Sequence, residues 1–63
     1  MTKAQRKTAF EAAKAFMVAV GNLRRGGTHQ QVKEAQDAWH KAAEGFDVFA
    51  RERILNRAML ATM

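Results

Sequence analysis

Apolar residues recur at steps of three and four over the first third of the chain, with charged residues between them. The recurring apolar positions are Phe10, Ala13, Phe16, Met17, Val20 and Leu23. At about 100° per residue these side chains share one side of a helix. Thr2 and Gln5 have the spacing of a capping box, which satisfies amide donors at a helix start, and a glycine pair further on suits a helix end. The pattern predicts a helix over about residues 3–25 and a turn at 26–27.

The apolar pattern starts again after the glycines, behind a second capping-box pair, Thr28 and Gln31. Its core-facing positions are Val32, Ala35, Trp39, Ala42, Ala43, Phe46, Phe49 and Ala50. Because this phase continues past Gly45, we predict one helix over about residues 29–52 or beyond. Gly45 is then a weak point that costs about 0.5–1 kcal/mol relative to alanine. The alternative is that Gly45 ends the helix and that residues 46–50 are irregular or form a short strand.

Two capped helices around a glycine pair predict an all-α fold, a two-helix antiparallel hairpin that forms a single domain over residues 1–63. In such a hairpin residues 51–63 overhang the first helix by about 12 residues, or about 18 Å. This overhang is apolar on two sides, since Leu55 and Met59 project nearly opposite the Trp39 face. We therefore expect a dimerisation segment that packs on a second copy around a twofold axis, giving a homodimer. The expected dimer or partner interface comprises Val48, Ile54, Leu55, Met59 and Leu60.

The size of the chain supports the same expectation. With 63 residues a domain buries only about 60% of its unfolded surface, and its core supplies roughly 3–5 kcal/mol. Cysteine is absent, so disulfides and thiolate metal sites are excluded. Oligomerisation is then the remaining way to stabilise so small a core. The longest apolar stretch, residues 15–20, is far shorter than the ~20 residues that span a bilayer, and no signal-peptide pattern is present. We expect a soluble protein of the cytoplasm with no membrane partner.

Positive charge gathers at one end of the expected hairpin, in a chain with a net charge of +5. The candidate contacts to an anionic partner are Lys3, Arg6, Lys7, Arg51, Arg53 and Arg57. We expect the last three to lie near a helix C-terminus, where the macrodipole favours cations, whereas Lys3 lies in a first turn, where it disfavours them. This end is suited to bind a phosphate backbone or an acidic protein surface. The other interpretation is a solvated, solubilising terminus.

Catalytic and metal chemistry find little support in the residue pattern. The two histidines, His29 and His40, share a helix face but lie about 16 Å apart along a helix, too far to share a metal ion. Asp37, His40 and Glu44 cluster at steps of three and four, which is more typical of a solvated salt-bridge row. No nucleophile has a base at a suitable spacing, and no glycine-rich phosphate loop is present. We expect no enzyme activity, no cofactor and no metal.

The opening of the chain contains a characteristic set of residues: Met1-Thr2-Lys3, Gln5 and Lys7-Thr8-Ala9. Over the first dozen residues this opening, like the length of the chain, is similar to the Rop family of plasmid RNA-binding helical hairpins. The resemblance implies the hairpin architecture, and it makes a nucleic-acid-binding regulator that uses the basic end the alternative function. The positions that the family uses on its first helix hold Glu11 and Ala15 here.

Taken as a whole, the length and sequence character of the chain resemble the short early proteins that lambdoid temperate bacteriophages encode between their recombination and excision genes. That resemblance implies a small dimeric protein, made early in infection, that favours lytic development by acting on the host. It implies no catalytic residues. We therefore expect a non-enzymatic, homodimeric helical interaction protein that binds a host protein.

Overall fold

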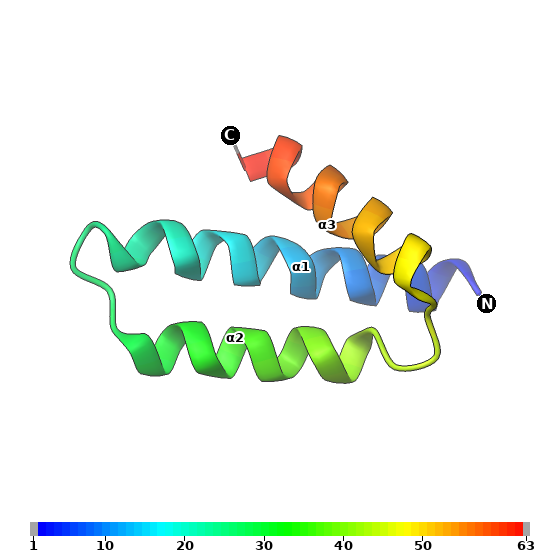
Figure 1. The fold of residues 1–63 in the computed structure, drawn as a ribbon, viewed down its shortest axis with the longest axis horizontal. Coiled ribbons are helices and arrows are strands. Elements are labelled where there is room, and N and C mark those ends of the chain that lie inside the picture. Colours follow the sequence, from blue (N-terminus) through cyan, green and yellow to red (C-terminus); the bar gives the residue numbers. More distant parts are fainter. Residues whose placement is uncertain (1, 63) are drawn as a thin grey trace.

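The computed structural model describes residues 2–62 and folds them into three helices (Figure 1). They are α1 (Lys3–Leu23), α2 (His29–Ala42) and α3 (Val48–Thr62). α1 and α2 form an antiparallel hairpin, and α3 returns along α1 in the same general direction as α1. The described residues contain no strand. The all-α class expected from the sequence is confirmed, but as three helices rather than two.

Both predicted capping boxes are present. The Thr2 hydroxyl accepts a hydrogen bond from the Gln5 amide at 3.2 Å, and the Gln5 side chain accepts one from the Thr2 amide at 3.1 Å. Thr28 and Gln31 repeat the arrangement at 3.2 and 3.3 Å. Between them α1 ends at Leu23, two residues before the predicted end. Each helix of the hairpin thus begins where its local residues satisfy the free amide groups.

The single helix predicted through Gly45 is wrong. α2 ends at Ala42, and Gly45 has φ +86°, a left-handed conformation that no helix interior contains. The side chain of Asp47 then accepts a hydrogen bond from the amide of Ala50 at 2.8 Å, which is the N-cap arrangement for a new helix. The alternative, that Gly45 ends the helix, is confirmed. Its second half is wrong, because the chain becomes helical again from Val48 and forms no strand there.

This turn removes the predicted overhang. Residues 48–62 fold back along α1 instead of extending beyond it (Figure 1). The segment therefore covers part of its own hairpin, and only its remaining faces are available to a partner.

The turn gives a test of the architecture by the sign of a stability change. We expect Gly45→Ala to lower the free energy of unfolding by about 1–2 kcal/mol, because an L-residue is strained in the left-handed region. The matched control is Gly21→Ala inside α1, where an added methyl group meets no atom within 4 Å. That change should raise the free energy of unfolding by about 0.5–1 kcal/mol. Thermal unfolding followed by circular dichroism measures both. If Gly45→Ala instead raised the free energy of unfolding, the result would contradict the turn and support a single helix through residue 45.

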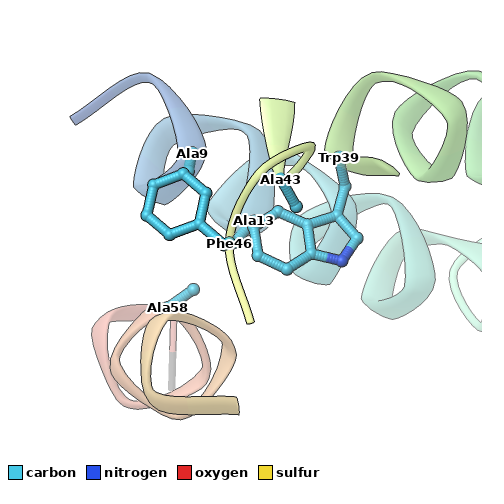
Figure 2. Packing of buried hydrophobic residues seen from close by; sticks show 6 residues of the cluster. All are labelled: Ala9, Ala13, Trp39, Ala43, Phe46 and Ala58. Atoms are coloured by element: carbon cyan, nitrogen blue, oxygen red, sulfur yellow. The ribbon is translucent and has the colours of Figure 1, made fainter. Parts of the chain in front are cut away.

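The core that joins the three helices is built mainly from alanine (Figure 2). Its buried members are Ala9, Ala13, Trp39, Ala43, Phe46 and Ala58. The small side chains let helix backbones approach closely, and Ala58, which points from α3 toward the cluster, is fully buried. No large side chain in the described part of the chain is fully buried. The core thus fixes the fold with little apolar area, and much apolar surface remains outside it.

Candidate functional site

α3 carries two surfaces that its own hairpin leaves open. The first, which we call the basic cleft, lies between α1 and α3 and has a volume of about 520 Å³. It is lined by Arg6, Lys7, Phe10, Phe46, Ala50, Arg53, Ile54 and Arg57. The second, the apolar outer face, comprises the exposed side chains of Val48, Phe49, Met59 and Leu60.

The basic cleft has cationic walls and an apolar floor. Arg6 and Lys7 come from the first turns of α1, and Arg53 and Arg57 come from the middle of α3. All four side chains are exposed, and no acidic residue lines the cleft. Within residues 2–62 the one ion pair joins Lys14 to Glu11 at 3.4 Å. The four cations of the cleft therefore have no carboxylate partner in the described part of the chain.

These cations have no stabilising role in the helices that carry them. The expectation that Arg51, Arg53 and Arg57 lie near a helix C-terminus is wrong, because α3 begins at Val48 and has no basic residue in its last turn. Arg53 and Arg57 are four residues apart, so on a helix they repel each other. α1 likewise has no acidic residue in its first turn to favour its dipole, and carries Lys3 there instead. The arrangement lowers stability, and proteins depart from favourable local charge placement mainly at functional sites.

The floor of the cleft is formed by side chains that the core already holds. Phe46 is buried, and Phe10, Ala50 and Ile54 pack against the core cluster as partly buried residues. The ammonium group of Lys14 lies 4.9 Å from the centroid of the Phe10 ring, within the range of a cation–π contact. The floor is therefore firm and apolar, and its aromatic rings are largely covered.

Of the six residues predicted to contact an anionic partner, four line the basic cleft and two do not. Arg6, Lys7, Arg53 and Arg57 line the cleft. Lys3 is exposed one helical turn before Lys7 and extends the positive charge beyond the cleft. Arg51 lies apart from the cleft: its side chain is half-buried, and its Nε is buried without a hydrogen-bond partner.

Of the five predicted interface residues, three are exposed and two are partly buried. Val48, Met59 and Leu60 are exposed, with 67%, 46% and 70% of their surface accessible. Ile54 and Leu55 instead pack partly buried against the core, because α3 folds back on α1.

Phe49 was missed as a surface residue. The sequence placed it on the core face of one long helix, yet it is 80% exposed. The signal that finds it is its distance from Leu60, eleven residues or three turns, which puts both on one face of α3 about 16 Å apart. Val48 and Met59 repeat that spacing. The apolar outer face therefore has one apolar pair at each end, and the exposed Glu52 and Asn56 lie between the pairs on the same side of α3.

Asp37, His40 and Glu44 do not come together as ligands. All three are exposed, and no group of three or more histidine or acidic residues within residues 2–62 lies close enough to hold a metal ion. The stretch from residue 2 to residue 62 also contains no helix whose length and hydropathy would suit a bilayer crossing.

Comparisons of the chain with protein-family models, with curated proteins and with solved structures give no match in any of the three.

Proposed function

We propose that the protein is a small homodimeric helical protein that acts by binding another protein and catalyses no reaction itself. The observation that supports this function best is that α3 has two different open surfaces, the basic cleft and the apolar outer face. One surface is suited to a second copy, and the other is suited to a partner of opposite charge. A chain of 63 residues that keeps both has the properties of an adaptor.

The extent of the molecular surface supports the homodimer. The accessible area is 4980 Å², whereas a monomer of 7.1 kDa is expected to expose about 4,100 Å². The excess of about 900 Å² means that the single chain exposes more surface than a compact protein of its mass. The outer face is also self-complementary: when two copies of α3 pack antiparallel around a twofold axis, Phe49 of one lies against Leu60 of the other.

The resemblance to early proteins of lambdoid temperate phages supports a bacterial host protein as the partner. On that basis the biological outcome of binding is the promotion of lytic development. The place of action is then the cytoplasm of the host cell.

Affinity capture from a bacterial lysate treated with nuclease tests this function. We expect the immobilised protein to retain a host protein, and a variant with Arg6, Lys7, Arg53 and Arg57 all changed to glutamine to lose it. The matched control changes four cations outside the basic cleft, Arg24, Arg25, Lys33 and Lys41, to glutamine and should keep the partner. Equal loss in both variants would mean that only the total charge attracts the captured protein, and would contradict a specific site.

The second candidate function is a nucleic-acid-binding regulator that uses the same end of the molecule. Its supporting observation is the set of exposed, unpaired cations around the basic cleft. If this function holds, the immobilised protein should capture nucleic acid from a lysate that has not been treated with nuclease. Its affinity for mixed RNA and DNA should then fall steeply as the salt concentration rises. Absence of binding at low salt would remove this candidate.

A further inference from the structure

We propose that the basic cleft binds an acidic amphipathic helix of the partner protein, with two turns of apolar side chains on the floor and carboxylates along both walls. This inference rests on the proposed function and names the chemistry of the partner. Its basis is the combination of an apolar floor and unpaired cations in one cleft between two helices.

The length of the cleft is suited to a short stretch of helix. On α3 its lining runs from Ala50 to Arg57, about 10 Å along the axis, which is close to two helical turns. On α1 it runs from Arg6 to Phe10. A groove between two helices with an apolar floor is a common receptor for a third, amphipathic helix, whose side chains enter at steps of three and four.

The positions of the charges specify the flanks of that helix. One wall offers Arg6 and Lys7, and the other offers Arg53 and Arg57, so a bound helix meets cations on both sides of its apolar face. Arginine binds a carboxylate through two parallel hydrogen bonds, which adds geometric selectivity to the charge attraction. Aspartate and glutamate residues on either side of the apolar stripe would therefore find partners.

Nucleic acid and a second copy of the chain are less suited to this cleft. A phosphate backbone uses cations but gains nothing from an apolar floor. A second copy of the chain brings its own net charge of +5. An acidic, partly apolar segment is the occupant that uses both the floor and the walls.

Fluorescence anisotropy with a labelled synthetic peptide tests the inference. The probe is a helix-forming peptide of about 15 residues, with leucine at steps of three and four and glutamate beside each leucine. Two control peptides keep one feature each: in one, serine replaces leucine; in the other, glutamine replaces glutamate. A single-stranded oligonucleotide of equal charge is the fourth probe. At about 0.15 M salt we expect saturable binding of the first peptide and at least about tenfold weaker binding of the other three probes.

The matched protein variants are Arg53→Glu with Arg57→Glu in the cleft, and Arg24→Glu with Arg25→Glu at the α1–α2 turn. Both pairs change the charge of exposed residues by the same amount. The cleft variant should bind the acidic peptide at least about tenfold more weakly, and the turn variant within about twofold of the unchanged protein. Circular dichroism of each variant confirms that the helices remain.

Three results would overturn the inference: equal weakening in both variants, equal binding of the serine-substituted peptide, or tighter binding of the oligonucleotide. Sedimentation of the same samples reports the homodimer separately. A dimer that does not bind the acidic peptide contradicts only the cleft. Selective peptide binding by a chain that stays monomeric contradicts only the dimeric part of the proposed function.

Discussion

Replacing Phe46 with alanine should leave the protein largely unfolded at 37 °C. Phe46 is 7% exposed, belongs to the buried cluster, and stands in the turn between α2 and α3. Loss of a buried phenylalanine costs about 3–5 kcal/mol. A domain of this size has roughly 3–5 kcal/mol of core stability in total. We therefore expect the helical circular dichroism signal and the emission of Trp39, which is in the same cluster, to change together.

The matched control is Phe49→Ala, the same substitution three residues further along the chain. Phe49 is 80% exposed, so its loss should change the stability of a single chain by less than about 0.5 kcal/mol. A loss of stability in Phe49→Ala that appears only at high protein concentration would report the dimer. Equal destabilisation by both substitutions at low concentration would contradict the packing of the α2–α3 turn.

The sequence predicted the hairpin because its signals are local. A capping box needs two residues three positions apart, and the turn near Gly26 needs only a residue that tolerates positive φ. Both signals act within one helical turn, so they do not depend on how the rest of the chain packs. The first helix and the start of the second were therefore predicted to within two residues.

The break at Gly45 was predicted only as the alternative because two signals disagreed. The apolar phase from Ala42 to Phe46 and Phe49 continues as if one helix ran through, whereas Gly45 and Asp47 repeat the end-and-start pattern of the first turn, a glycine followed by an N-cap residue. Periodicity describes which side chains would share a face if the helix continued. It does not show whether the helix continues, and here the capping chemistry determines the result.

The same break explains why the candidate site was only partly predicted. The clustering of basic residues from both ends of the chain could be predicted from the sequence. A two-helix hairpin places Arg53 and Arg57 near Arg6 and Lys7, and α3 brings them to much the same place. The apolar floor between them could not be predicted, since it depends on α3 folding back over α1. Ile54 thereby moves from the expected interface to the floor of the cleft.

Changing Phe49 and Leu60 together to aspartate should convert the proposed homodimer to a monomer. In an antiparallel pair of α3 helices these residues face each other across the interface, so the double variant loses two apolar contacts and places carboxylates opposite carboxylates. Like charges that face each other across an interface cost on the order of several kcal/mol. We expect at least about a hundredfold increase in the dissociation constant, measured by sedimentation at micromolar concentration.

Folding of the single chain should be little affected, because both side chains are largely exposed. Val18→Asp combined with Val20→Asp is the control: it adds the same two charges at residues that are 48% and 42% exposed on α1, and should leave the proposed dimer intact. Leu55→Asp is unsuitable as a test, since Leu55 is partly buried against the core. A double variant that remains dimeric would place the interface elsewhere.

A charge swap tests the antiparallel arrangement itself. Phe49→Asp combined with Leu60→Lys removes the same apolar side chains but places Asp opposite Lys at both ends of an antiparallel interface. Each new charge also lies at the end of α3 where the helix dipole favours it. We expect this variant to associate at least about tenfold more tightly than the double aspartate variant. If the two variants associate equally weakly, Phe49 and Leu60 do not face each other, and the antiparallel pairing of α3 is wrong.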